Sequence, residues 1–293
     1  MVSSGLAHCS LTMSLTLFCI VLCAAALHAG WNAIVKIKLD PFLTMTLICI
    51  ACTIIAIPAW VVVGLPEKAA WPWVVASIIL HFGYYAFLAL AYRRADMSQV
   101  YPIARGAAPL LTAFVSIVFV HDPVSLGNLI GILILASGVL LVSLRGHRRT
   151  TSSNGMAIVY ALATGVTISA YTVVDGLGAR AAGSPHTYAA ALFVGDSIPM
   201  VAVFVYRNGL RGFRPAIPFL WPAFAGGAMS LMAYWIVIWA MTQAPIALVA
   251  AVRETSVLFG ALIAVLVLKE PMTRVRVIAA CTTVLGLVAM RLL

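Results

Sequence analysis

The chain repeats part of its own sequence at a constant spacing, and this feature constrains its fold most strongly. Residues 96–123 read DMSQVYPIARGAAPLLTAFVSIVFVHDP, and residues 245–271 read PIALVAAVRETSVLFGALIAVLVLKEP. An offset of 148 residues aligns three pairs: Arg105 with Arg253, Asp122 with Glu270, and Gly138 with Gly286. Self-similarity at one fixed spacing indicates that a structural unit occurs twice. The sequence therefore predicts two related halves, residues 1–147 and 148–293.

The composition places both halves in a membrane. Hydrophobic residues make up 63% of the chain and charged residues 9%, with a mean hydropathy of +1.09, whereas soluble domains carry roughly 25% charged residues. Apolar windows of about 20 residues predict ten membrane-spanning helices. The expected spans are residues 12–35, 42–64, 71–92, 97–120, 125–144, 155–176, 186–206, 217–240, 246–268 and 273–292. These spans leave almost nothing for a soluble domain, so we expect an all-α integral membrane protein.

The basic residues outside the spans are unequally divided between the two sides. Thirteen Lys and Arg residues lie in the odd-numbered loops, and three lie in the even-numbered loops and termini. Because cytoplasmic loops carry an excess of Lys and Arg, we expect the odd-numbered loops to be cytoplasmic in a plasma (inner) membrane protein. The basic residues behind the net charge of +10 then orient the protein in the membrane and contact anionic lipid headgroups. No nucleic-acid partner is expected.

Three short motifs give the chain a family resemblance. The sequences His121-Asp122-Pro123 and Lys269-Glu270-Pro271 each precede a Gly-rich helix, and HAGWNAIVK, near the opening of the chain, ends the first span at residues 28–36. Together they resemble the ten-helix drug/metabolite transporter superfamily, in particular its EamA-like branch. The HAxWNxxxK opening is similar to that of members encoded near phosphonate-utilisation genes. The resemblance implies two inverted five-helix repeats around a central cavity, and export or exchange of small metabolites.

Four charged residues lie deepest in the predicted spans: Arg105, Asp196, Arg253 and Glu254. A charged side chain at the bilayer centre costs about 2.5–3.5 kcal/mol by insertion scales, so each one needs a partner, a wet cavity or a function. Arg105 and Arg253 lie roughly 11–12 Å from the starts of their helices. In inverted repeats those starts are on opposite faces, so both arginines reach the midplane, where such transporters bind substrate. The alternative is that each arginine is a structural pin, bonded to backbone carbonyls or, for Arg253, to a carboxylate such as Asp196.

Polar and aromatic residues at helical spacing predict the walls of the same site. Residues three, four or seven apart share one helix face, and polar faces are expected to avoid lipid. The expected substrate contacts, besides the two arginines and Glu254, are His81, Tyr85, Tyr101, Tyr171, Tyr234, Asn32 and Trp235. Polar residues that only hydrogen-bond one helix to another would produce the same pattern along a helix face, and this alternative stays open.

Two further patterns concern folding and association. The acids of Asp122-Pro123 and Glu270-Pro271 are expected to cap the helices that follow them, because an acid before proline suits a helix start. The small-residue positions Gly127, Gly131, Gly138, Gly260 and Gly286 allow close helix approach. They are expected either at a rocking interface within the monomer or at a homodimer contact.

The resulting functional prediction is a secondary transporter that works by alternating access. Its expected cargo is a small polar metabolite, an amino acid or another compound that bears a carboxylate or phosphonate, because a guanidinium group binds either anion bidentately. The candidate proton-coupling groups are Glu254, Asp196 and His81, and passive exchange is an equal alternative. No metal or cofactor is expected.

An intramembrane hydrolase is the main alternative. Asp175 and Asp196 lie on consecutive predicted helices, as the two acids of an intramembrane aspartyl protease would. The expected G-x-G-D is here Phe193-Val194-Gly195-Asp196, and Val174 rather than Tyr precedes Asp175. The sequence also lacks H-E-x-x-H, G-x-S-x-G and a phosphate-binding glycine loop. We therefore expect no enzymatic activity.

Overall fold

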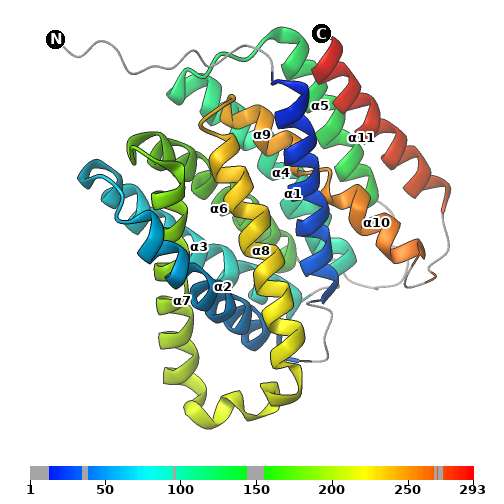
Figure 1. Cartoon of the computed structure of the whole chain (residues 1–293). Coiled ribbons are helices and arrows are strands. Elements are labelled where there is room, and N and C mark those ends of the chain that lie inside the picture. Colours follow the sequence, from blue (N-terminus) through cyan, green and yellow to red (C-terminus); the bar gives the residue numbers. More distant parts are fainter. Residues whose placement is uncertain (1–12, 35–38, 95–96, 144–154, 267–268, 270–272) are drawn as a thin grey trace.

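In a computed structural model of the chain, the apolar segments form helices that lie side by side as one bundle (Figure 1). The structure describes residues 13–34, 39–94, 97–143, 155–266, 269 and 273–293. Its long helices are α1 (Leu15–Ile34), α2 (Pro41–Val63), α3 (Trp71–Tyr92), α4 (Met97–Val115), α5 (Leu126–Ser143), α6 (Gly155–Ala181), α7 (Pro185–Asn208), α8 (Leu220–Ala240), α9 (Ile246–Arg253), α10 (Ser256–Leu266) and α11 (Arg274–Leu292). Over the described residues all ten predicted segments are helical, which confirms the all-α class. Helices suit this composition because they satisfy every backbone donor and acceptor inside the segment itself.

Local sequence fixes where several helices begin. Asp40 caps α2 by accepting from the backbone N–H groups of Phe42 and Leu43, and Pro41 occupies the first helical position. Ser184 caps α7 in the same way, again with a proline next to it. Proline suits the first turn because its missing N–H would have no partner there. These caps set where α2 and α7 begin, and α7 carries the candidate residue Asp196.

Helices from the first half of the chain pack against helices from the second half. The main contacts of this kind join α3 with α6, α1 with α8, α2 with α7, α4 with α6, and α5 with α11. The centre of the protein is thus built from segments far apart in the sequence, and side chains from both halves can meet there.

Glycines allow the closest of these contacts, between α5 and α11. A Cβ atom on Gly286 would lie 2.5 Å from the backbone nitrogen of Leu135, and one on Gly138 would lie 2.7 Å from that of Thr283. Gly131 faces the backbone of Met290 and Gly286 at similar distances. These glycines therefore form a seam within the monomer, whereas a Cβ on Gly260 would meet nothing within 4 Å.

The ninth and fourth predicted spans are not regular helices. The ninth is broken at Glu254 and Thr255, where i→i−3 backbone bonds replace the α-helical pattern between α9 and α10. The fourth continues from α4 into a π-helical turn, η2 (Ser116–Val120). Discontinuous helices are typical of transporter binding sites, and the break at Glu254 coincides with the predicted charged centre.

The residues that open the two repeated Pro motifs share one backbone conformation. His121 has φ of 58° and Lys269 has φ of 53°, and among the described residues only these two non-glycines have a positive φ. The left-handed conformation commonly ends a helix, although glycine usually occupies it. Glu270 and Pro271 themselves lie outside the described residues.

Candidate functional site

Three charged side chains meet at the centre of the bundle. Arg105 extends from α4, and its Nε lies 2.8 Å from one carboxylate oxygen of Glu254. Arg253, the last residue of α9, places a terminal guanidinium nitrogen 3.5 Å from the other oxygen. The three side chains are at most 3% exposed. We call Arg105, Arg253 and Glu254 the arginine cluster. It holds two cations and one anion, so its formal net charge is +1.

Hydroxyl groups from two other helices complete the first layer around the cluster. A terminal nitrogen of Arg105 donates to Ser256 Oγ at 2.8 Å, at the start of α10. A terminal nitrogen of Arg253 donates to Thr172 Oγ1 on α6 at 3.5 Å. Arg253 Nε is buried with no hydrogen-bond partner among the described residues. The hydrogen-bond donors of the cluster thus have only some of their acceptors within the described part of the protein, although buried charges normally are paired and hydrogen-bonded.

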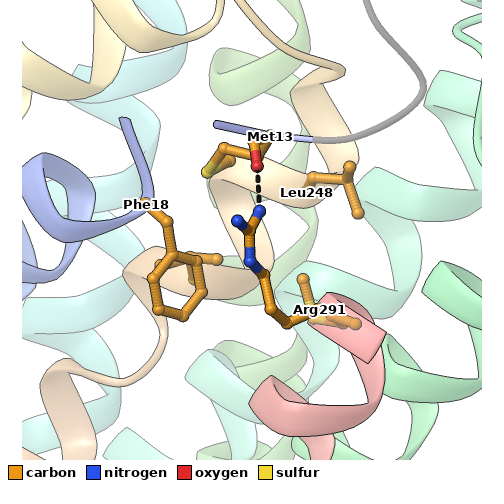
Figure 2. A pocket seen from close by; sticks show the side chains of 6 residues that line it. Met13, Phe18, Leu248 and Arg291 are labelled. Carbon is orange, nitrogen blue, oxygen red and sulfur yellow. Dashed lines mark hydrogen bonds between the residues drawn. The ribbon is translucent and has the colours of Figure 1, made fainter. Parts of the chain in front are cut away.

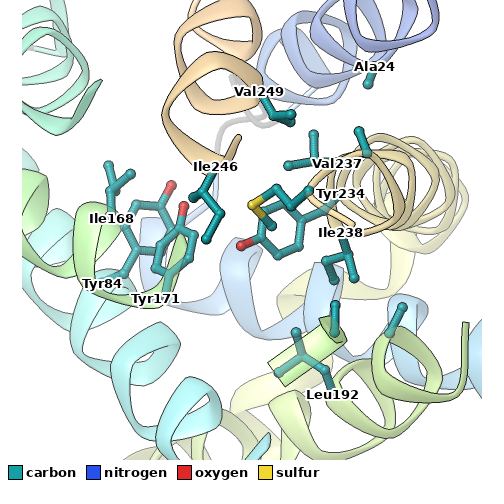
Figure 3. Close-up of a cluster of buried hydrophobic side chains, with 14 of the residues drawn as sticks. Ala24, Tyr84, Ile168, Tyr171, Leu192, Tyr234, Val237, Ile238, Ile246 and Val249 are labelled. Carbon is teal, nitrogen blue, oxygen red and sulfur yellow. The ribbon is translucent and has the colours of Figure 1, made fainter. Parts of the chain in front are cut away.

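Aromatic rings form one wall of the cluster. The guanidinium carbon of Arg253 lies 5.9 Å from the ring centre of Tyr171 and 5.7 Å from that of Tyr234, within cation–π range. His81 stacks on Tyr171 at 4.0 Å. Tyr171 from α6 and Tyr234 from α8 point into the same apolar core near Ile246 (Figure 3). These three ring-bearing residues were all predicted as substrate contacts. The structure brings Tyr171 and Tyr234 beside Arg253, and His81 packs on these two rings.

The two intramembrane aspartates bind different partners. Asp175 on α6 accepts hydrogen bonds from Tyr188 at 2.9 Å and from Tyr234. Asp196 on α7 accepts from Tyr85 at 3.2 Å and from the thiol of Cys49 at 3.8 Å. Each carboxylate has its own tyrosine donors, whereas the acids of an aspartyl protease share one site. Arg253 pairs with Glu254 rather than with Asp196, the carboxylate named in the structural-pin alternative.

Two of the remaining predicted contacts, Asn32 and Trp235, hydrogen-bond to histidines. The Asn32 side-chain amide donates to the His28 carbonyl one turn earlier on α1, at 2.7 Å. Trp235 Nε1 donates to His186 on α7 at 3.0 Å. Tyr101 lies in α4, but its side chain is outside the described part of the structure. His28, on the same helix as Asn32, interacts electrostatically with both arginines.

The predicted cap at Asp122 is wrong. Its carboxylate accepts from Ser116 Oγ, from the backbone N–H of Ile246 at 2.8 Å and from both terminal nitrogens of Arg180. Helix α5 is instead capped by Ser125, whose Oγ accepts from the Asn128 N–H. Asp122 therefore caps the first amide of α9, which lies 124 residues later in the chain. Helix packing brings the start of α9 to the Asp122 carboxylate, whereas α5, the next helix along the chain, is capped by Ser125.

A surface pocket lies apart from the arginine cluster. It lies between α1, α9 and α11 and is lined by Met13, Phe18, Leu248, Val252, Met290 and Arg291. The Arg291 guanidinium donates to the Met13 carbonyl across it (Figure 2). The lining is mostly apolar, and its one cation already has a carbonyl partner, so this pocket lacks the charge that distinguishes the cluster.

Comparison with known proteins agrees with this architecture. The model of the EamA-like transporter family, part of the drug/metabolite transporter superfamily, matches residues 14–144 and 155–292. The chain belongs to this family. It is therefore a multi-pass membrane protein of a transporter family, as the repeat and the helix motifs predicted. No curated protein sequence matches the chain.

Solved structures resemble this EamA-like protein in fold. Twenty-nine chains of solved structures match this chain. One is a crystal structure of a protein whose description states no function. It has a TM-score of 0.77 and 19% sequence identity, and the match covers 94% of this chain and 97% of that one. At this identity the likeness shows the shared fold alone.

Sequence reasoning missed several residues of the site in this EamA-like protein. Ser256 and Thr172 bind the arginines, and Tyr188 binds Asp175, yet none was singled out. The Cys49 thiol also contacts Asp196, although a cysteine inside an apolar helix is ordinarily a small packing residue. Hydroxyl and thiol residues are common inside membrane helices, so they stand out only when the charged partner is known. Among the described residues, no group of three His, Cys, Asp or Glu side chains could hold a metal ion.

Proposed function

We propose that this EamA-like protein is a secondary transporter of a small metabolite that bears a carboxylate or a phosphonate. The anion would bind between Arg105 and Arg253, and the aromatic wall of His81, Tyr171 and Tyr234 would cover its apolar part. Transport would proceed by alternating access, with export or exchange as its direction. The protein would reside in the plasma membrane with its odd-numbered loops in the cytoplasm.

The charge balance of the arginine cluster is the observation that carries this proposal. Two buried guanidinium groups share one carboxylate, which leaves an excess positive charge in a place where charge is costly. An anionic ligand would neutralise it and supply acceptors to donors such as Arg253 Nε, which has no hydrogen-bond partner among the described residues. Bidentate binding of carboxylate or phosphonate is a property of the planar guanidinium group.

The closed state of the cluster supports alternating access. Side chains that are at most 3% exposed are reached by a ligand only if helices move. The helix break beside Arg253, where i→i−3 bonds replace the regular α-helical pattern, offers a place for such movement. We expect the two halves, as inverted repeats, to rock about the cluster.

Thermal unfolding of the purified protein tests the proposal. The detergent-solubilised protein would be heated with a panel of small carboxylates and phosphonates, each beside its neutral amide or ester. A ligand at 100 times its Kd stabilises by about 2.7 kcal/mol, so a bound anion should raise the unfolding midpoint where its neutral counterpart does not.

Variants at the cluster complete the test. Arg105→Lys and Arg253→Lys keep the charge but lose the bidentate fork, and the shift should shrink strongly in both. Arg93→Ala, an exposed arginine, is the matched control and should keep the full shift. A panel in which neutral compounds stabilise as well as anions would contradict the proposal. An anion effect that survives both lysine variants would favour the structural-pin interpretation.

A further inference from the structure

Asp196 is a buried acid whose charge is poorly compensated. It lies on α7 and is 5% exposed. Its Oδ2 accepts from Tyr85 and Cys49, while its Oδ1 is buried with no hydrogen-bond partner among the described residues. Buried carboxylate oxygens are nearly always hydrogen-bonded, so each exception calls for an explanation.

Within the described part of the chain, the groups around Asp196 include no cation within ion-pair distance. Helix α2 presents Cys49 and Cys52, α3 presents Tyr85 and His81, and α6 presents Asp175. From α8, Tyr234 donates to Asp175 instead. The 3₁₀ segment η4 (Leu210–Phe219) packs against the far end of α7 through Phe213 and Phe204. Asp196 forms no ion pair with any of the residues that the structure describes.

We propose that Asp196 is a proton-binding site of the transport cycle, separate from the arginine cluster. A proton on Oδ1 would neutralise the buried carboxylate without a second charged side chain. A metal cation fits poorly, because hard cations prefer several oxygen ligands and one of the two groups on Oδ2 is a thiol. Glu254, another candidate, already has two guanidinium partners. This inference rests on the proposed transport function.

A continuous aromatic contact connects the two sites. Tyr85, which donates to Asp196, lies 6.4 Å from His81 between ring centres, and His81 stacks on Tyr171 at 4.0 Å. Tyr171 in turn lies beside Arg253. A proton that binds or leaves Asp196 would change the hydrogen bond of Tyr85, and hence the packing of the wall that the substrate contacts.

Infrared difference spectroscopy tests the site without a known substrate. A protonated carboxylic acid absorbs at a higher frequency than a carboxylate, so a pH step applied to the protein in proteoliposomes reports which acids gain or lose a proton. We expect a carboxylic-acid band in the wild type that responds to pH and is absent in Asp196→Asn. The band should persist in Asp175→Asn, Glu254→Gln and Arg105→Ala.

A second variant covers the case in which Asp196→Asn does not fold. Tyr85→Phe removes a donor to the carboxyl group, so the band should move to higher frequency. Wild-type and Asp196→Asn spectra that are identical, or a band unmoved in Tyr85→Phe, would overturn the proposal. If the band behaves as expected while no anion stabilises the protein, the proton site stands and the proposed anion transport fails.

Discussion

Asp122 and Arg180 form a bidentate ion pair, with guanidinium-to-carboxylate distances of 2.7 and 3.3 Å, across 58 residues of sequence. The same carboxylate binds the first amide of α9, and Arg180 also donates to the carbonyls of Met241 and Ala244. The pair thus ties together the ends of α4, α6, α8 and α9. These ends belong to the even-numbered loops, which we propose to lie outside the cytoplasm because they carry few basic residues. We interpret the pair as a clamp that holds these helix ends together.

Removing the clamp should destabilise the protein. Asp122→Ala leaves Arg180 without its carboxylate and the Ile246 amide without its acceptor, and breaking a buried pair costs about 3–5 kcal/mol. Because the Arg180 side chain is 29% exposed, we expect the low end of this range. The free energy of unfolding should fall by about 3 kcal/mol, which would be measured as a large fall in the thermal unfolding midpoint. The control is Arg93→Ala, since Arg93 and Asp40 are 3.7 Å apart and about half exposed. An exposed pair contributes about 0–1 kcal/mol, so equal effects of the two variants would contradict the clamp.

The glycine seam predicts a sharp contrast between two alanine substitutions. Gly286→Ala would place a Cβ 2.5 Å from the Leu135 nitrogen and 2.8 Å from the Gly131 oxygen, so α5 and α11 must separate. We expect loss of the monodisperse peak in size-exclusion chromatography. Gly260→Ala meets nothing within 4 Å and gains up to about 1 kcal/mol of helix propensity. A well-folded Gly286→Ala variant would show that the two helices are not held this closely.

The buried aspartates separate a transporter from an intramembrane hydrolase. A protease needs both acids at one scissile bond, whereas Asp175 and Asp196 have separate donors. We expect the purified protein to leave a fluorescent transmembrane peptide uncut over prolonged incubation. Cleavage that disappears in both Asp175→Asn and Asp196→Asn would establish the hydrolase instead.

The orientation inferred from the basic loops can be tested by labelling. In a background without the native cysteines, Lys68→Cys should react with a membrane-impermeant maleimide added to whole cells. Arg211→Cys should react only after the cells are permeabilised. The reverse pattern would invert the topology and place the Asp122–Arg180 clamp on the cytoplasmic side.

The sequence predicts the helices well because apolar length is a property of each segment alone. It misses the break at Glu254, since hydropathy averages over a window and does not register the i→i−3 bonds that end α9 at Arg253. The π-helical turn after α4 is hidden for the same reason. Local geometry inside a uniformly apolar segment depends on the neighbours that pack against it.

The charged centre is also predictable in part. The repeat offset identifies Arg105 and Arg253, and the cost of buried charge singles out Glu254. Their partners Ser256 and Thr172 come from other helices. Which side chains meet across the bundle depends on helix rotation and depth, and a single sequence does not fix these.

The central claim is that Arg105 and Arg253 bind the transported anion. Its most direct test is untargeted mass spectrometry of medium and cytosol from cells that overexpress the wild type, beside cells with Arg105→Ala at matched membrane levels. We predict that a carboxylate- or phosphonate-bearing metabolite changes its distribution across the membrane only with the wild type. A metabolite moved equally by both proteins, or one that carries no anionic group, would contradict the claim.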